Sequence, residues 1–235
     1  LWLALLLAAA PLVVAQSDEQ TAPKPGVTLN SVLSRGQVSC GVNQDRRGFG
    51  YLDPNTGEIR GLEVDVCRAL AAAIFNDASA VQLVPFAGSG GQAALEAGEL
   101  DVLLHTVIWD LTTDARPLLD FGPTLFYTGQ TFMVRADSEA QDWPDLDGAV
   151  ICIGEGTTAA TSLQAAMSRR GLTYQPVVLP TAAEAMTTFT NGECQAYSAS
   201  QLELENARQR AADPTAYTVW QGRDRLYTLE AFAPV

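Results

Sequence analysis

RGQVSCGVN (Arg35–Asn43) and DGAVICIGEGTT (Asp147–Thr158) decide the fold, because each begins the same building block. In both blocks a short apolar strand with a cysteine precedes an alanine-rich amphipathic helix. A Gly-Glu turn then leads into a second strand, in EAGELDVLL (Glu96–Leu104) and in TNGECQAYS (Thr190–Ser198). Strands that alternate with helices predict a parallel α/β sheet, so two copies predict two α/β lobes. Ligands of such sheets bind beyond the carboxyl ends of the strands, which predicts a cleft between the lobes as the site.

The composition is that of a globular and strongly acidic protein. The 235 residues are 47% hydrophobic and 17% charged, which is enough for two small lobes with cores of their own. The formal net charge is −13. Because a strongly acidic surface does not attract polyanions, the charge argues against nucleic acid and against anionic membranes as partners.

The first residues have the features of an export signal. Residues 1–14 are continuously apolar, and Val13-x-Ala15 offers a cleavage site for a signal peptidase. This stretch is too short to span a bilayer, which takes about 20 apolar residues. We expect a signal peptide over residues 1–15, a flexible lead-in over 16–27, and a periplasmic or extracellular location.

The four cysteines indicate two disulfides, because the chain is expected to be exported. Four cysteines allow three pairings. We expect one bridge in each lobe, Cys40–Cys67 and Cys152–Cys194, since the other pairings would lock the lobes together. A zinc site is the alternative, but the chain lacks a C-x-x-C spacing and has a single histidine. We therefore expect no metal and no other cofactor.

Periodicity and turn signals give the expected layout of the lobes. The clearest helix is expected over Leu62–Phe75, where apolar residues share one face, and a long strand is expected within Phe121–Arg135. We expect lobe 1 over residues 28–133, lobe 2 over 134–227 and the start of a return crossover over 228–235. On this division lobe 1 is incomplete and its C-terminal part is missing.

Several stretches together resemble the extracytoplasmic solute-binding proteins of general L-amino-acid ABC importers. They are CGVN…GF, GLEVDVCRALAAAIF, LDFGPTLFYTGQTFMVR, DLDGAVICI…GTT and GECQAY, in that order, between about Thr28 and Val235. The resemblance implies a periplasmic-binding-protein-like fold, in which two α/β lobes joined by crossover strands close on an amino acid or related small polar solute. It also implies an ABC permease as partner, a monomer, no enzymatic activity, and a chain truncated at its C-terminus.

The turn Gly156-Thr157-Thr158 is the expected seat for an anion. It lies between a buried strand and the start of a helix, where free backbone N–H groups and the helix dipole attract negative charge. The resemblance implies that the ligand carboxylate binds at this turn. The alternative is that Thr157 or Thr158 only caps its helix.

Aromatic side chains are the second group of candidates. Phe49 matches the position where the family places an aromatic side chain against the ligand. Trp109, Tyr127 and Tyr51 could line the same mouth of the cleft, although aromatic side chains in a strand-rich lobe more often belong to the core. His105, the only histidine, is interpreted as a buried, hydrogen-bonded side chain.

Two charged anchors of the family are replaced in this chain. Thr113 stands where the resemblance implies an arginine that clamps the α-carboxylate, and Ser200 where it implies the acid that binds the α-ammonium group. Desolvating both charges of a free amino acid without partners costs several kcal/mol. We therefore expect weak or no binding of ordinary L-amino acids. Arg116 or the Arg46-Arg47 pair could bring a cation to the cleft instead.

Two other functions remain open from the sequence. Some enzymes share this fold, such as dehydratases, and an enzyme would need an acid/base pair in the cleft. The candidates Glu63, His105, Asp110 and Glu155 form no recognisable catalytic set by their spacing. The other alternative is a degenerate sensor or adaptor lobe that keeps the fold and no longer binds an amino acid.

Overall fold

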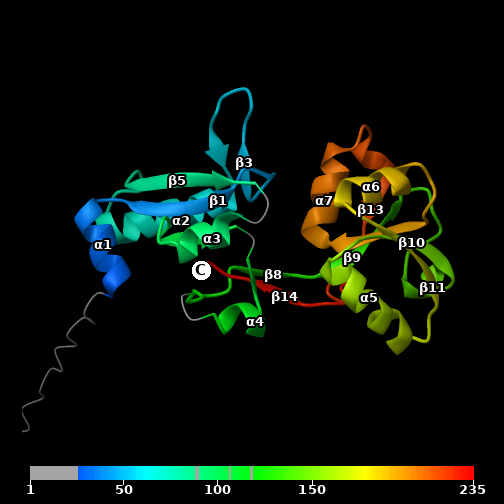
Figure 1. Cartoon of the computed structure of the whole chain (residues 1–235). Coiled ribbons are helices and arrows are strands. Elements are labelled where there is room, and N and C mark those ends of the chain that lie inside the picture. The colour runs from blue at the N-terminus through cyan, green and yellow to red at the C-terminus, as the bar shows by residue number, and fades with distance from the viewer. Residues whose placement is uncertain (1–25, 88–89, 106, 117–118) are drawn as a thin grey trace, which may run out of the picture.

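The protein consists of two α/β lobes joined by two extended segments (Figure 1). The computed structural model describes residues 26–87, 90–105, 107–116 and 119–235. The expected signal peptide and all but the end of the expected lead-in lie outside these residues. The two-lobed architecture predicted from the repeated building block is confirmed by the separate sheets of the two lobes.

Lobe 1 is built on a parallel three-stranded sheet in the order β5–β1–β6. Its elements are α1 (Val27–Arg35), β1 (Val38–Asn43), α2 (Leu62–Phe75), β5 (Val81–Phe86), α3 (Gly90–Glu96) and β6 (Val102–Leu104). The central strand β1 is buried along its whole length because β5 and β6 flank it and α2 packs on it. Val235 exchanges two backbone hydrogen bonds with Leu103, of 2.7 and 3.1 Å, so the last residue extends this sheet beyond β6.

Two small antiparallel sheets also belong to lobe 1. One is formed by β2 (Asp45–Arg46), β3 (Gly50–Leu52) and β4 (Ile59–Arg60). The other has the order β7–β14–β8 and is formed by β7 (Ile108–Trp109), β8 (Phe126–Thr128) and β14 (Glu230–Phe232), with the short helix α4 (Leu111–Asp114) after β7. The second sheet pairs strands from the middle and the end of the chain, so the return to lobe 1 happens within this chain.

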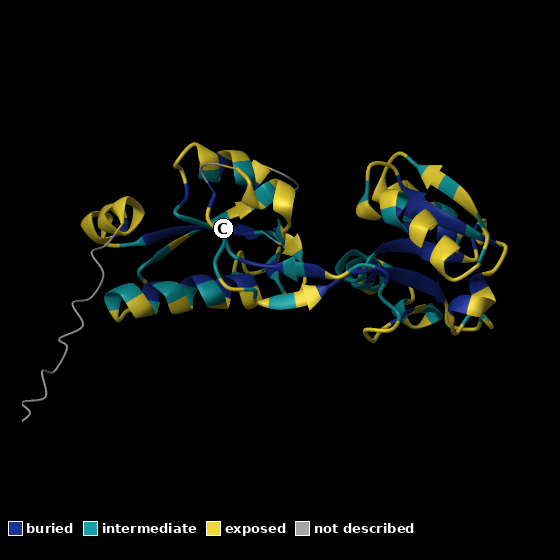
Figure 2. Cartoon of the chain, turned by 90° about the horizontal axis from the view of Figure 1, so that it is seen from below, coloured by how far each residue is buried: buried dark blue, intermediate teal, exposed yellow. Residues whose placement is uncertain are grey.

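Lobe 2 contains a five-stranded sheet in the order β11–β10–β12–β9–β13. Its strands are β9 (Gln130–Arg135), β10 (Ala149–Gly154), β11 (Tyr174–Leu179), β12 (Ala196–Ser200) and β13 (Tyr217–Val219). Its helices are α5 (Thr158–Arg169), α6 (Ala182–Thr190) and α7 (Gln201–Arg210), with 3₁₀ turns η1 (Trp143–Leu146) and η2 (Pro214–Ala216). Figure 2 shows the buried strands of this lobe beneath helices whose outer faces are exposed.

The expected single strand within Phe121–Arg135 is wrong, because the structure has two strands there. β8 pairs with β14 in lobe 1, and β9 pairs with β12 and β13 in lobe 2. The chain passes between the lobes at Gly129, the residue between these strands. The lobe boundary expected between residues 133 and 134 therefore falls inside β9.

Both expected disulfides are present. Cys40 bonds to Cys67 and ties β1 to α2, with Cα atoms 6.1 Å apart. Cys152 bonds to Cys194 and ties β10 to the turn before β12, with Cα atoms 5.7 Å apart. All four cysteine side chains are buried. Each bridge lies within one lobe, so the lobes stay free of a covalent cross-link.

Candidate functional site between the lobes

A cavity of about 320 Å³ is lined by both lobes. Its lining residues are Arg46, Arg47, Gly48 and Phe49 from lobe 1, and Leu202, Glu205, Asn206 and Gln209 from lobe 2. The lobe 1 residues lie at the β2–β3 turn, and the lobe 2 residues all lie on α7. Next to the cavity, the Arg210 guanidinium donates a 2.7 Å hydrogen bond to the backbone oxygen of Asp45. The two lobes therefore touch at the edge of this cavity.

The start of α2 holds the turn that carries Phe49. The backbone N–H groups of Leu62 and Glu63 donate to the carbonyl oxygens of Gly48 and Phe49, each over 3.0 Å. Gly61 precedes them with φ of 133°, and a Cβ there would lie 2.2 Å from the Phe49 oxygen. The first N–H groups of a helix have no partner within the helix, and here they fix the turn. Phe49 is thereby placed at the cavity wall.

The Phe49 ring also rests on the small sheet between the lobes. Its centroid lies 5.1 Å from that of Phe126 on β8. Phe126 in turn stacks on Phe232 of β14, with centroids 4.8 Å apart. β8 ends just before Gly129 and β14 begins just after Thr228, so these paired strands adjoin the two crossover segments, the stretches around Gly129 and Thr228 that pass between the lobes. One aromatic row thus connects the cavity wall to the strands that join the lobes.

The lobe 2 wall is one face of α7. Leu202, Glu205, Asn206 and Gln209 follow the i, i+3, i+4, i+7 spacing that places residues on one side of a helix. Sequence reasoning missed this set, although the spacing was visible, because a polar helix face is usually solvated. Ser200 is the N-cap of the same helix, and its hydroxyl accepts from the Glu203 N–H over 3.2 Å.

Of the eight ligand-binding residues predicted from the sequence, Phe49 lines this cavity. Thr157 caps α5, as the alternative interpretation required: its hydroxyl accepts from the Ala160 N–H over 3.3 Å and donates to the Gly154 oxygen over 2.7 Å. Gly156 and Thr158 are exposed beside it, with Gly156 at φ of 69°. This turn is not part of the cavity lining, and its ligand role stays a prediction.

Trp109, Thr113 and Tyr127 lie on lobe 1 outside the cavity lining. Trp109 is 43% exposed, and its indole N–H donates to the Asp114 carboxylate over 3.0 Å. The Thr113 backbone N–H donates to Asp110, which caps α4, and Tyr127 is 63% exposed on β8. The ligand roles of these three residues and of Ser200 also stay predictions.

The chain matches the bacterial extracellular solute-binding proteins, family 3, over residues 38–221, a range that includes most of both lobes and all the residues named in the cavity lining. The chain belongs to this family. It is 37% identical to the glutamate/glutamine/aspartate/asparagine-binding protein BztA of Rhodobacter capsulatus, over 77% of this chain and 53% of the relative. It is 33% identical to the general L-amino acid-binding periplasmic protein AapJ of Rhizobium johnstonii, over 82% of this chain and 56% of the relative.

Solved structures give the same result. A periplasmic binding protein from Brucella ovis with glutathione bound is 33% identical and superimposes with a TM-score of 0.72. The similarity covers 88% of this chain and 64% of that protein. The chain spans little more than half the length of the two curated relatives named above. The predicted family and the predicted periplasmic-binding-protein-like fold are confirmed.

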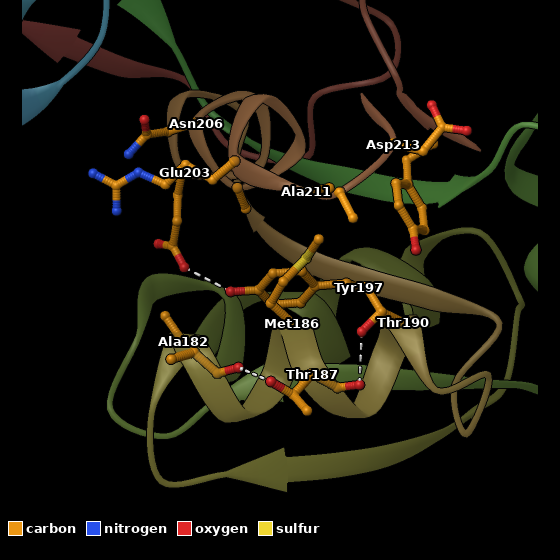
Figure 3. Close-up of a pocket in the computed structure, with 14 residues that line it drawn as sticks. Ala182, Met186, Thr187, Thr190, Tyr197, Glu203, Asn206, Ala211 and Asp213 are labelled. Carbon is orange, nitrogen blue, oxygen red and sulfur yellow. Dashed lines mark hydrogen bonds between the residues drawn. The ribbon is translucent and has the colours of Figure 1, made fainter. Parts of the chain in front are cut away.

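The chain has a second, larger hollow, whose lining residues all belong to lobe 2. It measures about 730 Å³ and lies between α6 and α7 (Figure 3). On its wall the buried Tyr197 hydroxyl donates to the Glu203 carboxylate over 2.6 Å, and burial raises the pKa of Tyr197 above its ordinary value. Asn206 borders both hollows. Of these two hollows, formed by described residues, the smaller has walls from both lobes.

Glu63 and His105, two of the groups considered for acid/base chemistry, have structural partners. The buried Glu63 carboxylate accepts hydrogen bonds from the backbone and side-chain nitrogens of Asn43, over 2.8 and 2.6 Å. His105 is half-buried with its Nε2 atom 3.3 Å from the Phe86 oxygen, and burial lowers its pKa. Within the described ranges, no three or more His, Cys, Asp or Glu side chains gather as a metal site. No helix in the described part is long and apolar enough to cross a membrane.

Proposed function

We propose that this chain is the solute-capturing component of an ABC uptake system and binds a small polar solute in the cavity between its lobes. The observation that carries the proposal is the lining of that cavity by residues of both lobes. A solute held by both walls favours the closed arrangement of the lobes, because it binds that state more tightly than an open one. The family membership of the chain supports the same function.

The protein works, on this proposal, outside the cytoplasmic membrane as a monomer, and it delivers its solute to an ABC permease without changing it chemically. The relatives bear the names of solute-binding proteins, and no acid/base pair faces the cavity among its described lining residues. Among the described lining residues Glu205 is the single carboxylate, and it already accepts hydrogen bonds from Arg208 and Gln221, over 2.9 and 3.0 Å.

The solute itself is proposed to differ from a free amino acid recognised by its two charges. Ser200 uses its hydroxyl to cap α7, and Thr113 lies on α4 outside the cavity lining. Neither residue can supply the charge that the family anchor would. The Brucella protein holds glutathione, a larger solute, so glutathione is a useful candidate, and the four amino acids in the name of BztA serve as the comparison.

Calorimetry on the complete protein tests the function. We expect at least one polar solute from a panel of common L-amino acids, small carboxylic acids and glutathione to bind and to raise the unfolding temperature. The variant Phe49→Ala should weaken this binding, whereas Val178→Ala, on an exposed strand of lobe 2, should not. Nuclear magnetic resonance of the solute after incubation should show it unchanged. A folded protein that binds nothing in the panel, or one that converts a solute, would contradict the proposal.

A further inference from the structure

The lobe 1 wall of the cavity carries two positive charges in a chain of formal net charge −13. Arg46 and Arg47 are consecutive, and both line the cavity. Across the described ranges neither forms an ion pair with a carboxylate, whereas the arginines elsewhere on lobe 1, such as Arg60 with Asp53 and Arg116 with Glu96, do. In an acidic protein, arginines beside a cavity whose charge is not paired with a carboxylate attract anions to that cavity.

Arg47 is held in place by an aromatic partner that leaves its charge uncancelled. Its guanidinium lies over the Tyr51 ring, 4.2 Å from the centroid, and donates a 2.9 Å hydrogen bond to the Tyr51 hydroxyl. Arg46 lies on β2 opposite Gly50 and is partly buried. The neighbouring Asp45 side chain is exposed and is not in the cavity lining, because successive residues of a strand point to opposite faces.

The lobe 2 wall has no carboxylate free to balance a cationic group. Both oxygens of Glu205 accept hydrogen bonds, one from Arg208 and the other from Gln221. Asn206 and Gln209 present neutral amides, and the buried Oδ1 atom of Asn206 has no hydrogen-bond partner in the described part of the chain. A ligand ammonium group would therefore lose its hydration at this wall without meeting an opposite charge.

We propose that the cavity selects a solute by an anionic group, bound by Arg46 and Arg47 of lobe 1, and does not require an ammonium group. This inference rests on the proposed function and names the chemical class of its solute. Guanidinium groups bind carboxylates through short, charge-assisted and often paired hydrogen bonds. The amides of Asn206 and Gln209 offer neutral hydrogen bonds from the other lobe. Phe49 covers the apolar part of the solute.

Three probes with the same five-carbon skeleton test the inference by calorimetry on the complete protein. They are glutarate, glutaramide and 1,5-diaminopentane, which are anionic, neutral and cationic. We expect glutarate to bind about tenfold or more tightly than either of the others, and to weaken as salt rises. The double variant Arg46→Gln/Arg47→Gln should lose about tenfold or more of the glutarate affinity and little of any glutaramide affinity.

The matched control is Arg60→Gln, which removes one positive charge from β4 of the same small sheet, outside the cavity lining. It should keep the glutarate affinity within about twofold of the unchanged protein, since the Arg60 charge is exposed, screened by salt and already paired with Asp53. Unfolding temperatures of all variants establish that they are folded.

Three results would overturn the inference: no glutarate binding, equal or tighter binding of the neutral or cationic probe, or full glutarate affinity in the double variant. Each of these leaves the proposed function standing as long as some polar solute binds. A folded protein that binds no polar solute at all overturns the proposed function instead. The two failures are therefore distinguishable.

Discussion

Gly129 and Thr228 face each other where the two crossover segments run side by side between the lobes. A Cβ atom at Gly129 would lie 2.1 Å from the backbone oxygen of Thr228. Around this contact the Gln130 N–H donates to the Thr228 hydroxyl over 2.8 Å, and the Tyr227 N–H donates to the Gln130 oxygen over 3.0 Å. Only a residue without a side chain lets the two segments approach this closely.

The variant Gly129→Ala should therefore destabilise the protein. Its methyl group must push the crossover segments apart, because the atom in its way is backbone and cannot rotate aside. We expect the free energy of unfolding to fall by about 1–3 kcal/mol, the usual cost of overpacking. Thermal and urea unfolding measure the change.

The control for this variant is Gly90→Ala at the start of α3, where the new Cβ would meet only ordinary contacts at 3.6 Å. Alanine favours a helix over glycine, so this control should be neutral or slightly stabilising. Equal unfolding midpoints for the two variants would show that the crossover contact carries no such constraint.

Local signals in the sequence predict the helices of this fold well. The bounds predicted for α2 are those of the structure. Periodicity marks the apolar face of α2, and α6 starts with a capping box in which Thr181 and Glu184 bond to each other's backbone. The one-bridge-per-lobe argument also predicts both disulfides, because it depends only on lobe order.

Features that depend on distant parts of the chain are the ones that sequence reasoning missed. The split of the expected long strand at Gly129 arises because β8 pairs with β14, about a hundred residues later in the chain. The α7 wall of the cavity is missed for the same reason, since it faces Arg46 and Arg47 only when the lobes are placed together. The family resemblance pointed to Phe49, which lines the cavity, and its ligand role stays a prediction.

The adjacent hydroxyl groups of Thr157 and Thr158 at the start of α5 are expected to have different roles, one in helix capping and the other in anion binding. Thr157→Val removes the cap of α5 and should lower the free energy of unfolding by about 1 kcal/mol. Thr158→Val changes an exposed side chain and should alter it by less than about 0.5 kcal/mol. The anion-seat prediction requires that Thr158→Val also weaken solute binding by about 1–3 kcal/mol. An unchanged dissociation constant in this variant would leave the turn with a capping role only.

His105 should make the protein less stable on the acid side of neutrality. Burial lowers its pKa, and the nearby Arg46 charge acts in the same direction, against the Phe86 oxygen and Asp45, which raise the pKa. The unfolded chain then binds a proton from about pH 6.5 downward, while the folded protein does so only at lower pH. Stability from this group is present above that range and is lost as the pH falls through it.

The variant His105→Gln isolates this contribution. Between pH 7 and pH 5 the variant should lose less unfolding free energy than the unchanged protein, by roughly a few tenths of a kcal/mol, because a half-exposed group is partly screened. Urea unfolding at several pH values measures the difference in unfolding free energy between the variant and the unchanged protein. The contributions of the carboxylates cancel in this difference, because both proteins contain them. Parallel pH profiles would mean that His105 titrates alike in the folded and unfolded states.

A single added charge on α7 tests whether the cavity distinguishes anions from cations. Asn206→Asp replaces a neutral amide at the lobe 2 wall with a carboxylate of nearly the same shape. The new charge repels a bound carboxylate and attracts an ammonium group, so glutarate affinity should fall by about fivefold or more while binding of 1,5-diaminopentane strengthens.

The matched control is Asn191→Asp, the same change at the exposed end of α6, which should move neither affinity beyond about twofold because salt screens a distant charge. Opposite shifts for the two probes are the expected result by calorimetry. Equal weakening of both probes would instead show that Asn206 supports the shape of α7 and that its charge does not reach the solute.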